Sequence, residues 1–132
     1  MENNQKYALI TGATSGIGHE LAKLFAKDKY NLVIVARDSS ALERTATELR
    51  SGGIQVLTIA KDLFLRESAQ EIYNEVRSKG VHIDVLVNDA GQGHYGKFED
   101  TDLDKEIDII QLNIISCITL TKLFLKDMIA RN

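Results

Sequence analysis

The chain has 132 residues, of which 16 are basic and 19 acidic, so its formal net charge is −3 at pH 7. This balance does not favour a nucleic acid or an anionic membrane as partner, because both attract a surplus of Lys and Arg. Cys117 is the single cysteine, which excludes an intramolecular disulfide, and the length predicts one domain over residues 1–132.

The chain begins with a mostly polar segment, residues 1–6, which lacks the apolar core of a signal peptide. We find no apolar run that approaches the length of a membrane span. We therefore expect a cytoplasmic protein with no membrane partner.

Four short apolar runs predict buried strands of a parallel sheet, because they are apolar on both faces. They cover residues 7–10, 32–36, 54–59 and 83–87. A segment with helical spacing of apolar residues follows each run. Four such units, joined by short connections and right-handed crossovers, predict an α/β fold, a Rossmann-type doubly wound parallel sheet.

The inner faces of the first three helices follow from this spacing. They comprise Ile17, Leu21, Leu24 and Phe25 in the first helix, Leu42, Ala46 and Leu49 in the second, and Ala69, Ile72, Tyr73 and Val76 in the third. Ser39 or Ser40 can cap the second helix.

The final helix is expected from about residue 102 to about residue 129, and its apolar residues cover more than one stripe. Four strands and three other helices cannot bury such a helix completely. We therefore expect more of the same polypeptide, another subunit, or both to cover it.

A glycine-rich turn joins the first strand to the first helix, with the sequence Thr11-Gly12-Ala13-Thr14-Ser15-Gly16-Ile17-Gly18. Such a turn lets the backbone approach a pyrophosphate and presents free amides at a helix N-terminus. Gly12 would make the sharp turn, Gly16 would permit close approach, and Gly18 would let the helix pack on the strand. The strand before it and the helix after it favour a dinucleotide site over a plain structural turn.

Together with Asn88-Asp89-Ala90-Gly91 and with Asn113, this turn resembles the cofactor half of the short-chain dehydrogenase/reductase family, in register over all 132 residues. The resemblance implies that Thr14, Ser15 and Ile17 line the pyrophosphate turn. It also implies that Asp62 and Leu63 contact the adenine, although Asp62 can equally cap the helix that follows.

The same resemblance implies that Asn88, Ala90 and Gly91 keep a backbone role beside the cofactor. Asp89 replaces the family's second Asn, which removes an amide donor. Asn113 would hold a water in the proton relay to a catalytic Lys, or would make a polar contact that stabilises its helix. The loop over residues 91–98 should lie over the nicotinamide end, with His94 and Tyr95 more readily packing the loop than touching substrate.

Ala36-Arg37-Asp38 ends the second strand, where the family uses an acid at the position of Ala36 to bond the 2′-hydroxyl of NAD. The Arg37 guanidinium suits a 2′-phosphate, so we predict NADP(H) over NAD(H). Asp38 could still reach the ribose, Ser15 is not basic, and Arg37 could instead be a solvated surface charge.

The family's catalytic Ser and Tyr-x-x-x-Lys are absent from these residues, since no Tyr has Lys four positions later. The resemblance therefore implies an oxidoreductase for a small-molecule ketone or secondary alcohol, present here as a truncated cofactor half that is inactive alone. It also implies a homo-oligomer through the final helix. The alternatives are a non-catalytic dinucleotide-binding module and a structural α/β domain without nucleotide. The scattered His19, His82 and His94 suggest no metal.

Overall fold

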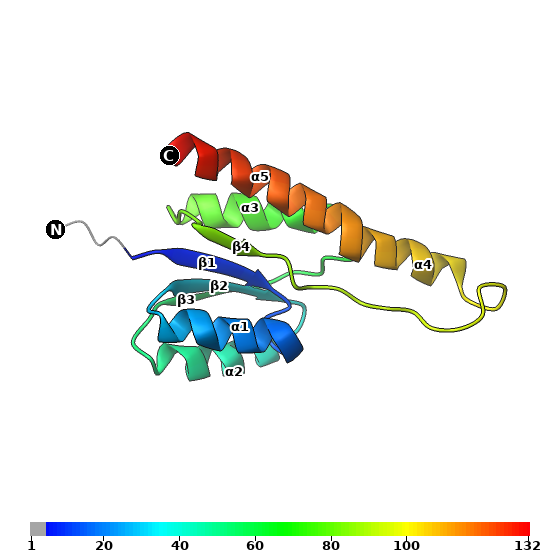
Figure 1. The fold of residues 1–132 in the computed structure, drawn as a ribbon, viewed down its shortest axis with the longest axis horizontal. Coiled ribbons are helices and arrows are strands. Elements are labelled where there is room, and N and C mark those ends of the chain that lie inside the picture. The colour runs from blue at the N-terminus through cyan, green and yellow to red at the C-terminus, as the bar shows by residue number, and fades with distance from the viewer. Residues whose placement is uncertain (1–4) are drawn as a thin grey trace.

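The computed structural model describes residues 5–132, and Figure 1 shows its four-stranded parallel sheet with strand order β3-β2-β1-β4. The strands are β1 (Tyr7–Thr11), β2 (Asn31–Ala36), β3 (Val56–Ala60) and β4 (Val85–Val87). The helices are α1 (Gly16–Lys27), α2 (Ser39–Arg50), α3 (Ser68–Ser78), α4 (Leu103–Ile110), the π-helix η1 (Gln111–Ile115) and α5 (Ser116–Arg131). The predicted Rossmann-type α/β fold is confirmed.

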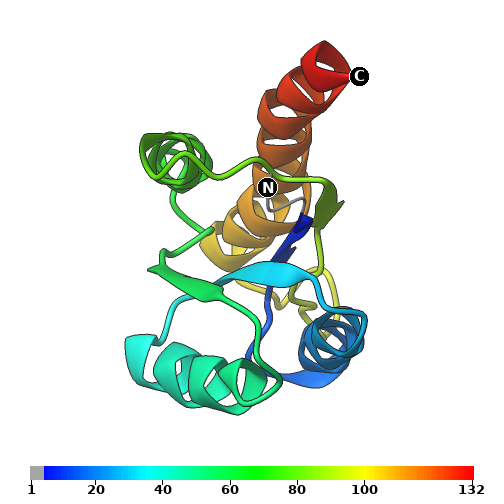
Figure 2. The ribbon, with the colours of Figure 1, turned by 90° about the vertical axis from the view of Figure 1, so that its left-hand side faces the viewer.

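The sheet lies between two helical layers, as Figure 2 shows from the end of the molecule. Side chains alternate across a strand, so neighbours in β1 enter different cores. Ala8 and Ile10 belong to the core that includes residues of α1 and α2. Leu9, which pairs with Val33 of β2, belongs to the core that includes residues of α3 and α5.

The inner faces of α2 and α3 are those that the sequence predicts, since Leu42, Ala46 and Leu49, and likewise Ala69, Ile72 and Val76, are buried. The prediction for α1 is wrong in part. Ile17 and Leu24 are 72% and 58% exposed, while Gly18, Ala22 and Ala26 face the sheet. Small residues on that stripe allow a close approach of helix and strand, which leaves the large apolar residues beside it outside the contact.

The final helix is continuous from Leu103 to Arg131, with the π-helical segment η1 in its middle. It packs along α3 in Figure 1 and buries Leu112, Leu120 and Phe124. Its other side leaves apolar residues exposed, namely Leu103, Ile107, Ile110, Ile114, Ile115, Ile118, Leu125 and Ile129. The described residues therefore leave this helix incompletely covered, as the sequence predicts.

The same helix corrects the expectation that no apolar run reaches membrane-spanning length. Its 29 residues, with a mean hydropathy of 1.5 over the most apolar window, are long and apolar enough to cross a membrane by length and composition. Core helices of soluble proteins meet the same criteria. Here Ser116 donates to the Leu63 carbonyl at 2.7 Å and Asp127 accepts from Tyr73 of α3 at 2.8 Å, so the helix is bound to the segment after β3 and to a second helix.

Candidate functional site

A cavity of about 580 Å³ opens where the carboxyl ends of the strands meet the N-terminus of α1. Its wall comprises Gly12, Thr14, Ser15, Gly16, Ile17, Val35, Ala36, Arg37, Asp38, Lys61, Asp62, Leu63, Phe64, Asp89, Ala90, Gly91, Gln92 and Leu112. Of the predicted site residues, Gly18, Asn88 and Asn113 lie outside this wall and the others are brought together in it. In an open parallel sheet this edge is where ligands bind.

The glycine turn has the backbone that its sequence predicts. Gly12 and Gly16 have φ of +66° and +57°, the left-handed region that favours glycine. A Cβ added at Gly16 would meet no atom within 4 Å, so its backbone faces open space in the cavity. A Cβ added at Gly18 would lie 2.6 Å from Oδ2 of Asp89, so Gly18 is needed for packing.

The N-terminus of α1 is left without a side-chain cap. Its N-cap residue Ser15 makes no capping hydrogen bond, and its first turn holds no acid. In contrast, Asp38 caps α2 and Asp102 caps α4. The first amides of α1 are thus available to an anionic group, and together with the glycine turn they fit a pyrophosphate.

Thr11 is a site-building residue that the sequence reasoning did not single out. Its hydroxyl oxygen accepts hydrogen bonds from the amides of Asp89 at 3.1 Å and Ala90 at 3.0 Å. This buried side chain therefore joins the end of β1 to the segment after β4 and holds Ala90 in the cavity wall. A hydroxyl at the end of an otherwise apolar strand is the signal that could have found it.

Asn88 and Asn113 are not among the residues of the cavity wall, and their side-chain amides make structural hydrogen bonds. The Asn88 side chain donates to Oγ1 of Thr121 in α5 at 2.9 Å. Asn113, in η1, accepts from the backbone amide of Gln92 and donates to its carbonyl, both at 2.9 Å. This double contact fastens the loop after β4 to the long helix and matches the predicted polar contact; the predicted water relay stays a prediction.

The two acids at the strand ends are both engaged by backbone. Asp38 Oδ1 accepts from the amides of Ser40 at 2.9 Å and Ala41 at 3.1 Å, so Asp38, not Ser39 or Ser40, caps α2. Asp62 Oδ1 accepts from the Phe64 amide at 2.9 Å in a tight turn. The alternative that Asp62 caps the next helix is wrong, because α3 begins only at Ser68.

Two cations lie in the cavity wall, and they differ in their partners. Lys61, which the sequence reasoning missed, is 2.8 Å from Glu71, and this hydrogen bond raises the pKa of the Lys61 ammonium. Among residues 5–132, Arg37 forms no ion pair with a carboxylate. Its guanidinium instead lies over the ring of Phe64, with 5.1 Å between Cζ and the ring centroid. Phe64 was also missed, because that contact depends on the tertiary fold.

The loop after Gly91 extends away from the sheet in Figure 1. Gly91 and Gln92 line the cavity, but the side chains of Tyr95 and Phe98 are 100% and 88% exposed. The expectation that Tyr95 packs the loop is therefore wrong. The predicted position of the loop over a nicotinamide stays a prediction.

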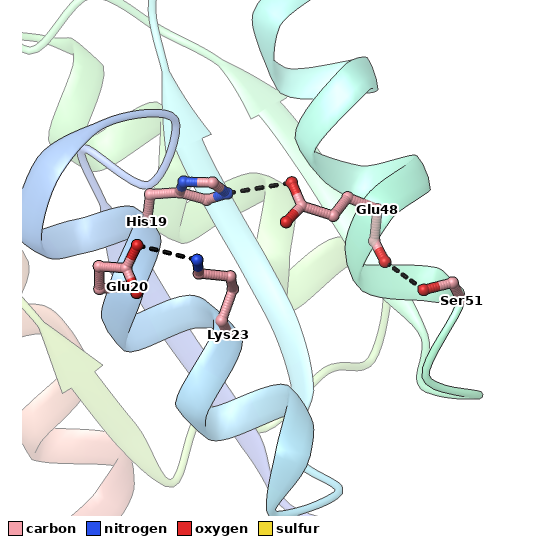
Figure 3. A network of polar contacts seen from close by, with 5 residues as sticks. All are labelled: His19, Glu20, Lys23, Glu48 and Ser51. Carbon is pink, nitrogen blue, oxygen red and sulfur yellow. Dashed lines mark hydrogen bonds and ion pairs between the residues drawn. The ribbon is translucent and has the colours of Figure 1, made fainter.

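A separate polar network joins α1 to α2 on the outside of the domain (Figure 3). His19 Nε2 lies 3.1 Å from Glu48 Oε2, and Lys23 Nζ lies 2.8 Å from Glu20 Oε1. The hydrogen bond from Lys23 lowers the pKa of the Glu20 carboxyl. Within residues 5–132, no group of three or more His, Cys, Asp or Glu residues could hold a metal ion.

Comparison with known proteins identifies the family that shares this sequence and fold. The sequence model of the short chain dehydrogenases matches residues 6–132. A very-long-chain 3-oxoacyl-CoA reductase of Mycosarcoma maydis is 33% identical over 129 residues, which cover 95% of this chain and 37% of the relative. The chain thus spans well under half the length of that relative.

Two solved structures are similar over nearly the whole chain. L-sorbose reductase from Gluconobacter frateurii, complexed with NADPH and L-sorbose, has a TM-score of 0.91 and 33% identity, over 96% of this chain and 49% of that one. The bulky-bulky ketone specific alcohol dehydrogenase from Comamonas testosteroni has a TM-score of 0.90 and 31% identity, over 97% of this chain and 51% of that one.

Proposed function

We propose that this chain, which belongs to the short-chain dehydrogenase family, is the cofactor-binding part of an NADP(H)-dependent oxidoreductase. The observation that carries the proposal is the difference between the two charged residues after β2. Arg37 lies at the cavity without a carboxylate partner among residues 5–132, while Asp38 is engaged in capping α2. A guanidinium favours a 2′-phosphate, and an acid committed to amides is less available to a 2′-hydroxyl.

The remaining wall fits the rest of a dinucleotide. The uncapped start of α1 and the glycine turn would hold the pyrophosphate, and Asp62 and Leu63 would lie against the adenine. The nicotinamide would lie toward Ala90, Gly91 and Gln92. NADPH, when bound, supplies the hydride of the reaction, and this chain orients it and neutralises its phosphates.

The substrate class is a small-molecule ketone or the corresponding secondary alcohol. The names of the two similar structures, an L-sorbose reductase and a ketone-specific alcohol dehydrogenase, support that class. Reduction of a carbonyl also needs a proton donor beside the forming alkoxide. The four tyrosines of this sequence lack the partner Lys, so we propose that these 132 residues bind the cofactor without turning it over.

We further propose that the exposed face of the long helix, defined as Ile107, Ile110, Ile114, Ile118 and Leu125, pairs with a second copy of the chain. Exposed apolar surface of this extent favours association in water. The net charge of −3 does not favour an anionic membrane as the alternative cover, and we propose a cytoplasmic location.

The test is a direct comparison of affinities by isothermal titration of the 132-residue chain with NADPH and NADH. We expect NADPH to bind more tightly, and Arg37→Met to remove most of the difference. Tighter binding of NADH would overturn the cofactor preference. Turnover of NADPH with simple ketones would overturn the proposal that these residues are inactive alone.

A further inference from the structure

Arg37 and Phe64, two residues of the cavity wall, contact each other, and the site described above gives this contact no role. The Arg37 guanidinium carbon lies 5.1 Å from the centroid of the Phe64 ring. Phe64 itself is held in place, since its ring packs against the core on the α3 side and its amide donates to Asp62 at 2.9 Å. A fixed ring thus lies beneath a long, charged side chain.

This geometry restricts the conformations of the Arg37 side chain without using its hydrogen-bond donors. A cation over an aromatic face is attracted by the ring quadrupole. The guanidinium N–H groups point outward in the plane of the group, so a contact between its carbon and the ring face leaves N–H groups available to a phosphate. Arg otherwise loses side-chain rotamer entropy when it is ordered, and a ring that orders it beforehand reduces that loss on binding.

The neighbouring charges do not compete for Arg37. Asp38 accepts from two amides of α2, and Lys61 is paired with Glu71. The other acids of the cavity wall are Asp62, which accepts from Phe64, and Asp89, whose Oδ2 lies beside Gly12 and Gly18. The cation–π contact with Phe64 is thus the interaction that the described residues show for the Arg37 guanidinium.

We propose that Phe64 is a positioning residue, which holds the Arg37 guanidinium ready for the 2′-phosphate and so sets the preference for NADP(H) over NAD(H). This inference rests on the proposed function, because it assumes that Arg37 binds that phosphate. It adds that the preference is shared between a residue after β2 and a residue after β3, which are 27 positions apart in the sequence.

The experiment uses two probes that differ only by the 2′-phosphate, 2′,5′-ADP and 5′-AMP, titrated into the 132-residue chain. We expect Phe64→Leu to weaken 2′,5′-ADP about two- to fivefold, the range of a partly exposed cation–π contact, and to leave 5′-AMP unchanged. Phe64→Tyr keeps an aromatic face and should retain the affinity. Phe98→Leu is the matched control, since it makes the same substitution at an exposed residue outside the cavity.

The outcomes separate this inference from the proposed function. Arg37→Met should weaken 2′,5′-ADP about ten- to a hundredfold, as expected for a charged hydrogen-bonding group, and Phe64→Leu should add nothing to it in the double variant. If Arg37→Met has no effect, the cofactor preference itself is wrong. If Arg37→Met weakens binding and Phe64→Leu does not, or Phe64→Leu weakens both probes equally, the positioning role is wrong. Unchanged thermal unfolding of each variant excludes loss of fold as the cause.

Discussion

The centre of the sheet and its β4 edge differ in how completely the described residues cover them. Around β1 and β2 the strands are enclosed on both faces, and Leu9, Ile10, Leu32 and Ile34 have no exposed surface. At the edge, β4 has three residues, all half-buried, and the long helix beside it exposes isoleucines on its free side. The enclosed region holds the glycine turn and Arg37. The proposed dinucleotide site thus adjoins the well-covered strands, whereas the β4 side leaves apolar surface uncovered by the described residues.

The largest difference between the two regions is expected when one isoleucine in each is truncated to alanine. Ile34→Ala removes a fully buried side chain of β2 and should lower the free energy of unfolding by about 2–5 kcal/mol. Ile118→Ala removes a side chain that is 58% exposed and should cost less than about 0.5 kcal/mol. Urea unfolding followed by circular dichroism measures both. Equal losses would mean that the helix face is covered as well as the sheet.

The second prediction concerns close packing under the glycine turn. Gly18→Ala places a Cβ 2.6 Å from Oδ2 of Asp89 and should destabilise the fold by about 1–3 kcal/mol and weaken NADPH binding. Gly52→Ala is the control, because its Cβ would lie 3.5 Å from the Leu49 carbonyl, an ordinary contact. A Gly18→Ala variant as stable as wild type would show that α1 can shift away from β1 at little cost.

The Thr11 hydroxyl links the end of β1 to the segment after β4, so its removal should affect both the stability of the fold and the order of that segment. Thr11→Val leaves the amides of Asp89 and Ala90 without their acceptor and should cost about 1–2 kcal/mol. Thr11→Ser keeps the hydroxyl and should recover most of that loss. Hydrogen exchange at the Ala90 amide is the readout, and we expect it to be faster in the valine variant. Unchanged exchange would contradict the link.

The exposed helix face should respond to charge through association and not through folding. Ile118→Glu puts a carboxylate in the middle of the proposed pairing face, and burying it there without a partner is unfavourable. We expect sedimentation to shift toward the monomer, with a change below about 0.5 kcal/mol in the unfolding free energy of the dissociated chain, measured at a dilution where both proteins are monomeric. A wild-type chain that sediments as a monomer, or that binds neutral lipid vesicles through this face, would contradict pairing of two copies.

The smallest expected effect is a pH dependence on the outer surface of α1. The hydrogen bond from Lys23 lowers the pKa of Glu20 below its ordinary value of 4.5. The ion pair therefore contributes stability above pH 4.5, and this contribution is lost as the pH falls through the lowered pKa. Glu20→Gln should flatten the dependence of Tm on pH in that acid range and leave it unchanged near neutrality. An identical acid slope in both proteins would show that the pair contributes nothing.

The sequence predicts the enclosed region better than the open one, and the reasons are physical. Apolar runs and a glycine turn are local signals, so β1 and β2 and the position of the cavity follow directly from them. The predicted inner face of α1 is wrong at Ile17 and Leu24, because a stripe of small residues at 18, 22 and 26 gives a weaker hydrophobic signal than these two large side chains. The cation–π contact of Arg37 with Phe64 and the two hydrogen bonds between Asn113 and Gln92 join separate segments, so no local pattern reveals them.

Asp38 limits how the cofactor preference of this fold can be redesigned. Its carboxylate starts α2, so recruiting it to a ribose hydroxyl would leave the Ser40 and Ala41 amides without their acceptor. Ala36, at the end of β2 and in the cavity wall, does not cap a helix. An acid introduced there could reach the ribose while the start of α2 stays intact. If the proposed use of NADP(H) is right, the substitution that would turn a descendant of this chain toward NAD(H) is therefore at position 36.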